Sequence, residues 1–90
     1  MDELKVFLQT APSIFNGTAA STAELRRALA IYLAKGEMCG FSQGELIDYL
    51  GISSPSVLEL SGFSDAEQEQ AMFLLGELTD AEIRDAKSSI

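Results

Sequence analysis

One spacing recurs along this chain and constrains its fold more than any other feature: a Ser or Thr followed three residues later by Glu. It occurs at Ser21 and Glu24, at Ser42 and Glu45, at Ser64 and Glu67, and at Thr79 and Glu82. In such a capping box the hydroxyl accepts the amide N–H of the third helical residue, and the carboxylate returns to the amide of the cap residue. Four helix starts at these intervals predict an all-α fold.

The turn residues between the boxes predict where each helix ends. A fifth start is Ser54-Pro55, because proline at the first helical position loses no hydrogen bond. Asp2 is a suitable cap for a short N-terminal helix, which Ala11-Pro12-Ser13 is expected to end. The predicted helices cover residues 3–9, 22–35, 43–50, 55–61, 65–76 and 80–88. Residues 1–90 then form one domain, a small bundle of five or six short helices.

Apolar residues at helical spacing predict the core of this bundle. In the helix 22–35 the core stripe is Leu25, Leu29, Tyr32 and Leu33, and Lys35-Gly36 supplies a cation and a stop at the C-terminal end. Met38 and Phe41 in the following loop are expected to plug the core, and Cys39 is expected to pack as a small hydrophobe.

The helix 65–76 departs from a single stripe, because five apolar residues follow one another at positions 71–75. Such a run places apolar side chains around most of the helix surface. A single neighbouring helix can bury only one stripe of that surface. We expect this helix either to lie at the centre of the domain or to form an oligomer interface through Met72, Phe73 and Leu75.

The stretch from Ser42 to Gly62 is predicted to form two short helices joined at Gly51, which is expected to adopt the left-handed conformation that a Cβ disfavours. Apolar stripes at Leu46, Ile47 and Leu50 and at Val57 and Leu60 flank Ile52, the expected plug of the turn. With its apolar residues at Leu46, Ile52, Val57 and Leu60 and its glycine at Gly51, the segment 43–62 resembles the helix-turn-helix of bacterial and phage repressor-type transcriptional regulators. The resemblance implies a helix-turn-helix-like core and, in that family, DNA binding.

Two features oppose a transfer of that activity. Ile47 stands where the family usually has alanine at the helix crossing, and the second helix offers no Arg, Lys, Asn or Gln to read base edges. Between Gly36 and Ile83 the chain also carries ten acidic residues and no Lys or Arg. Binding to a duplex normally depends on a basic face that displaces counterions, so DNA is a disfavoured partner. An alternative interpretation is that these acids only solvate the surface.

The sequence contains few residues of the kinds that usually carry out catalysis. There is no histidine to activate a nucleophile, and Cys39 is the single cysteine. We find no ligand set for zinc or calcium and no glycine-rich phosphate loop. We therefore expect a non-enzymatic protein with no catalytic residue, no cofactor and no metal.

The lengths of the apolar runs, the N-terminus and the cysteine content together predict the cellular location. Apolar runs such as 29–34 and 72–75 are far shorter than a bilayer requires, and no secretory leader opens the chain. A lone cysteine also suits a reducing compartment. These features predict a soluble cytoplasmic protein with no membrane association.

These observations favour a small acidic helical module that regulates or inhibits another protein by binding its basic or apolar surface. A transcription regulator or another nucleic-acid-handling protein would present such a surface, and the resemblance to phage regulators suggests a phage or mobile-element origin. The residues expected to contact the partner are Pro55, Leu58, Glu59, Glu45 and Asp48.

Two alternatives stay open. One is a sequence-specific DNA-binding regulator that docks as a dimer, with phosphate contacts from Lys5, Arg26, Arg27 and Lys35. The other is a structural assembly subunit, a homodimer or larger oligomer built through the apolar run at 71–75.

Overall fold

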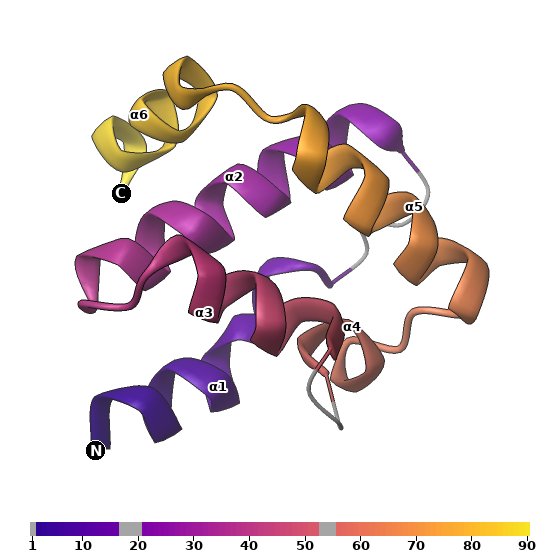
Figure 1. Ribbon diagram of the computed structural model, residues 1–90, viewed down its shortest axis with the longest axis horizontal. Helices are drawn as coiled ribbons and strands as arrows, with labels where there is room; N and C mark the ends of the chain where they lie inside the picture. The colour runs from indigo at the N-terminus through magenta and orange to yellow at the C-terminus, as the bar shows by residue number, and fades with distance from the viewer. Residues whose placement is uncertain (1, 17–20, 53–55) are drawn as a thin grey trace.

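Helices account for all the regular secondary structure in the part of the chain that the computed structural model describes, which comprises residues 2–16, 21–52 and 56–90. Figure 1 shows their arrangement. Along the chain they are α1 (Asp2–Ile14), α2 (Thr22–Met38), α3 (Gln43–Ile47), the π-helical segment η1 (Asp48–Ile52), α4 (Val57–Leu60), α5 (Asp65–Glu77) and α6 (Asp80–Ser89). The prediction of a small all-α bundle is confirmed.

The capping residues place most helix starts where the sequence predicts them. At Ser42, Ser64 and Thr79 both halves of the capping box are formed. At Ser21 the hydroxyl accepts the amide of Glu24 at 3.4 Å. Each cap satisfies an amide that has no partner within its own helix, so α2, α3, α5 and α6 all begin at the predicted residue or within one of it.

The start of α4 differs from the prediction. Ser54 and Pro55 lie outside the described residues, and the helix begins at Val57 with Ser56 as its cap. The Ser56 hydroxyl is buried and accepts the amide of Glu59 at 3.1 Å. Ser56 and Glu59 repeat the spacing of the four other boxes, so the sequence contained this signal and the prediction missed it.

The N-terminal helix is longer than predicted, because it continues through Pro12 to Ile14. Ala11 and Phe15 are four residues apart and both are fully buried, so the helical path carries both into the core. Nearby hydroxyls also bond to helix carbonyls: Thr10 Oγ1 donates to the Val6 carbonyl at 3.0 Å. Burial here outweighs the amide that proline lacks.

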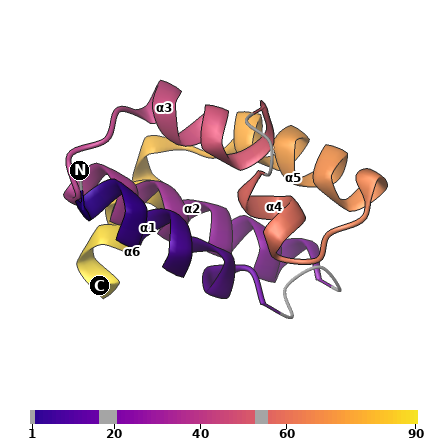
Figure 2. The same ribbon diagram turned by 90° about the horizontal axis from the view of Figure 1, so that it is seen from below.

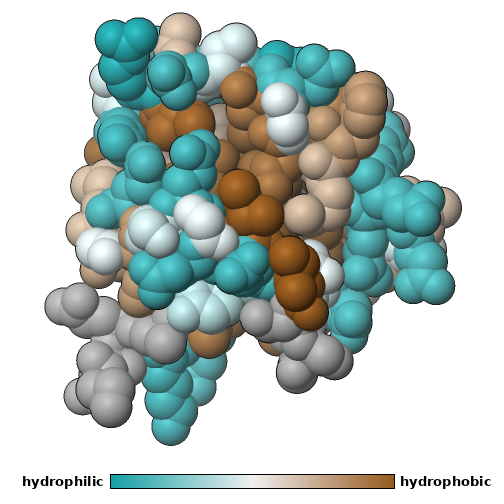
Figure 3. Space-filling view, in the orientation of Figure 1, coloured by the Kyte–Doolittle hydropathy of each residue, from teal (hydrophilic) through white to brown (hydrophobic). Residues whose placement is uncertain are grey.

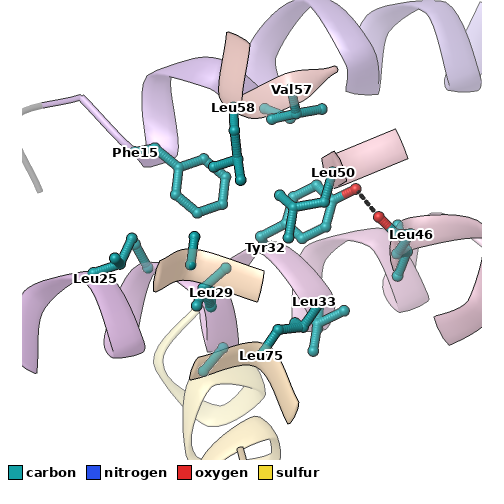
Figure 4. Close-up of a cluster of buried hydrophobic side chains, with 14 of the residues drawn as sticks. Phe15, Leu25, Leu29, Tyr32, Leu33, Leu46, Leu50, Val57, Leu58 and Leu75 are labelled. Carbon is teal, nitrogen blue, oxygen red and sulfur yellow. Dashed lines mark hydrogen bonds between the residues drawn. The ribbon is translucent and has the colours of Figure 1, made fainter. Parts of the chain in front are cut away.

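Helix α2 lies at the centre of the bundle, with α1, α3, α5 and α6 packed against it, and Figure 2 shows the same arrangement from below. The predicted α2 stripe is buried as expected, and Figure 4 shows its side chains among those of the neighbouring helices. The residues of this stripe are Leu25, Leu29, Tyr32 and Leu33. The Tyr32 hydroxyl donates to the Leu46 carbonyl, which fixes α3 against α2.

The glycines have other roles than the predicted ones. Gly36 lies inside α2, buried against Leu46, and the positive φ that accompanies the end of this helix belongs to Gly40, at +96°. Gly51 belongs to η1, has no positive φ, and lies close to the Met72 side chain. Close approach of neighbouring side chains, and not a left-handed backbone, is therefore what Gly36 and Gly51 provide.

The prediction that Met38 and Phe41 fill the core after α2 is also only partly correct. Since α2 runs on to Met38, that side chain ends on the surface with 61% of its area exposed, and Cys39 is exposed as well. Phe41 is partly buried, and its ring packs 5.5 Å from that of Phe7 and 6.4 Å from that of Tyr49.

Candidate protein-binding surface

The residues expected to contact a partner fall into three groups in the structure. Glu45, Asp48 and Glu59 are exposed, as a contact residue has to be. Leu58, by contrast, is completely buried, so its assignment to the residues that contact a partner is wrong. Pro55 lies outside the described residues.

The register of α4 explains this correction. Because the helix starts at Val57, Val57 and Leu58 turn toward the core and Glu59 and Leu60 turn toward solvent. Leu60, which was predicted to share the buried stripe with Val57, has 56% of its area exposed. Leu60 therefore replaces Leu58 as the apolar residue that α4 offers to a partner.

The π-helical segment produces a second exposed apolar residue. Leu46 and Leu50 are fully buried, whereas Ile52, the predicted plug of the turn, has 72% of its area exposed. A π turn places one more residue in each turn than an α-helix does, so the side chains after Leu50 leave the α-helical register. We name the exposed residues Glu45, Asp48, Ile52, Glu59 and Leu60 the α3–α4 surface.

Hydrophobic side chains reach the surface in this part of the molecule. Figure 3 shows brown side chains running through the middle of the face on which Figure 1 draws α3 and α5. The segments η1 and α4 are in contact, so the residues of the α3–α4 surface come from adjoining parts of the chain. Singly exposed apolar residues are ordinary, but exposed apolar residues on adjoining segments are typical of an interaction site.

The charges of the chain are divided unevenly between two parts. Residues 43–77 contain seven acidic residues and no Lys or Arg, a charge of −7, and the rest of the chain contains seven acidic and six basic residues, a charge of −1. Six of the seven acids in the first part are exposed and Glu67 is partly buried. Hydrogen bonds from Ser64 lower the pKa of Glu67 and keep it ionised. The α3–α4 surface thus lies in a strongly negative part of the molecule.

The cations proposed for phosphate contacts lie on α1 and α2, and none of them lies on the second helix of the helix-turn-helix pattern. Arg26 is already engaged: its Nε and Nη2 each donate to Glu82 at 2.7 Å, and Nη2 also donates to the Glu77 carbonyl. This pairing lowers the pKa of Glu82 to about 2. Arg26 therefore attaches α6 to α2 and is not free to bind phosphate.

The predicted oligomer residues also separate in the structure. Leu75 is buried, so its assignment to an interface is wrong, and Met72 is partly buried close to Gly51. Phe73 alone of the three is strongly exposed, with 68% of its area accessible. Helix α5 therefore buries Ala71, Leu74 and Leu75 and leaves one aromatic ring in solvent.

No group of three or more His, Cys, Asp or Glu side chains among the described residues is arranged to hold a metal ion. In the same part of the chain, no helix combines the length and the apolar character needed to cross a bilayer. Comparisons with family models, with curated proteins and with solved structures find no match to this chain.

Proposed function

We propose that this protein is a small acidic regulator or inhibitor that binds another protein through the α3–α4 surface. The observation that carries the proposal is the exposure of Ile52 and Leu60 within a part of the chain that has seven acids and no base. Apolar side chains supply contact area once water is excluded, and the acids around them select a partner of opposite charge.

The partner that fits this chemistry has a basic surface with an apolar centre. Proteins that handle nucleic acids have a basic face, because they must neutralise phosphates. An acidic module can cover such a face and compete with nucleic acid for it. Exposed Glu45, Asp48 and Glu59 are the residues we assign to the charged contacts, and Ile52 and Leu60 are those we assign to the apolar contact.

Capture from the native cell tests this proposal when it is done with matched variants. We expect the tagged protein to recover one basic protein in stoichiometric amount, and less of it as the salt concentration rises. Glu59→Lys and Ile52→Ser should each reduce the recovery at least about tenfold, the loss expected when a contact worth about 1.4 kcal/mol is removed.

The control is Asp85→Lys, which makes the same change of charge on α6, where Asp85 is exposed outside residues 43–77. It should retain the partner. Equal recovery by all variants would show that the α3–α4 surface is not the contact site. Recovery of nucleic acid in place of a protein would favour the DNA-binding alternative.

A further inference from the structure

An apolar groove lies on a part of the molecule that the proposed function does not use. It has a volume of about 480 Å³ and is lined by Val6, Phe7, Thr10, Lys35, Met38, Cys39 and Ile90. Phe7 is buried, whereas Val6, Met38 and Ile90 are each at least half exposed. These three are half of the six large apolar residues that are strongly exposed in the described part of the chain, so exposed apolar area is concentrated here.

The groove also contains a cation. Lys35 is exposed. Among the side chains that the structure describes, those from residue 5 onward outside the gaps, the salt bridges join Arg26 to Glu82 and Lys87 to Glu37, and neither includes Lys35. An occupant that fits the groove therefore combines an apolar group with a nearby negative charge.

Helix α5 carries that combination on its outer face. Glu69 and Glu77 stand four residues before and after Phe73, and residues at this spacing lie on the same side of a helix. All three are exposed. We name Glu69, Phe73 and Glu77 the acidic ridge: one aromatic ring with a carboxylate on either side.

The groove and the acidic ridge of one copy cannot meet. The groove is lined by the middle of α1 and by residues at the C-terminal ends of α2 and α6. Figures 1 and 2 show these segments on the left of the molecule and α5 on the right. A contact between the two surfaces therefore needs a second copy of the chain. Two different surfaces that join in this way make a heterologous, head-to-tail contact, which leaves a free groove and a free ridge at the ends.

We propose that the protein self-associates head to tail, with Phe73 of one copy inserted into the groove of the next and Glu69 or Glu77 facing Lys35. The complementarity of charge and apolar character carries this inference: the cation and the apolar walls are on one surface, and the carboxylates and the ring are on the other. The α3–α4 surface takes no part in the contact, so the inference does not depend on the proposed function.

Sedimentation of two variants, alone and mixed, tests this inference. Phe73→Glu removes the ridge and Met38→Glu disrupts the groove; both side chains are exposed, so both variants should keep the circular dichroism spectrum of the wild type. Wild type should associate increasingly with concentration in the micromolar range. Each variant alone should sediment as a monomer, since the loss of an aromatic anchor weakens an interface by more than about tenfold.

The equimolar mixture is the decisive sample, because it contains one intact groove and one intact ridge. It should form a dimer and nothing larger. A monomeric mixture, or a wild type that is monomeric at every concentration, would overturn the proposal. So would a Met38→Glu variant that still dimerises, since that result indicates a symmetric contact through α5 alone.

Lys35→Glu should weaken the association, and Lys5→Glu, a control on α1 outside the groove lining, should leave it less affected.

Discussion

Leu46 is attached to α2 by two contacts of different kinds. Its carbonyl accepts a hydrogen bond from the Tyr32 hydroxyl, and its side chain fills the space left by Gly36 in the last turn of α2. The burial of Tyr32 raises the pKa of its phenol, which remains a hydrogen-bond donor throughout the physiological range. The contact of α2 with α3 thus depends on glycine at position 36, where no side chain competes with Leu46 for space.

The substitution Gly36→Ala tests this contact. A Cβ at Gly36 would lie 2.7 Å from Leu46 Cδ1 and 2.9 Å from its Cγ, and Leu46 is fully buried with little room to move. We expect a loss of about 1–3 kcal/mol in the free energy of unfolding, the usual cost of overpacking a core.

The matched control for this measurement is Gly76→Ala in α5. A Cβ there meets nothing within 4 Å, and Gly76 has no positive φ. This change should be neutral or should stabilise the protein by up to about 1 kcal/mol. If urea unfolding gave the same midpoint for Gly36→Ala and Gly76→Ala, Gly36 would have no special role in packing.

At the scale of the helices, local signals predicted most of the fold. Ser-x-x-Glu and Thr-x-x-Glu spacings act within a few residues of the chain, so they could be read from the sequence, and the α2 stripe followed from its 3.6-residue period. Ile52 could not be placed in this way, because its exposure accompanies the π-helical turn after Asp48. Leu60 could have been, because its exposure follows from the start of α4 at Val57, which the missed spacing of Ser56 and Glu59 indicates.

The contact between α6 and α2 should depend on pH. The Arg26 guanidinium, which bonds to both carboxylate oxygens, is the main cause of the lowered pKa of Glu82, about 2 instead of the ordinary 4.5. A lowered pKa contributes stability that is fully present above about pH 4.5 and is lost as the pH falls toward 2.

Thermal melting of Glu82→Gln at several pH values checks this contribution. Glutamine can still form the capping box with Thr79 but carries no charge for Arg26. The variant should melt below wild type between pH 5 and 7, and the difference should shrink as the pH falls from about 4.5 to 2. A difference that stays constant over this range would mean that the ion pair does not stabilise the fold. In an Arg26→Met background the substitution should have a smaller effect.

For the whole molecule, the uneven distribution of charge along the chain is the property that most narrows the choice of binding partner. The count of acids and bases was visible in the sequence, but the pairing of Arg26 with Glu82 and of Lys87 with Glu37 was not. These pairs join helices that are far apart in the chain, and they reduce the number of cations free to meet a phosphate. The resemblance of residues 43–62 to a helix-turn-helix stays a prediction, and Ser56, buried as the cap of α4, is in no position to read bases.

The most direct measurement is a titration of a labelled mixed-sequence DNA duplex, followed by fluorescence anisotropy at about 0.05 M and about 0.15 M salt, a range over which phosphate contacts weaken steeply. It needs no knowledge of the partner. We predict no binding at either salt concentration up to about 10⁻⁴ M protein, because residues 43–77 bring seven acids and no base to the duplex. Binding at micromolar or lower concentration that weakens as salt rises would contradict the account and would indicate a DNA-binding regulator.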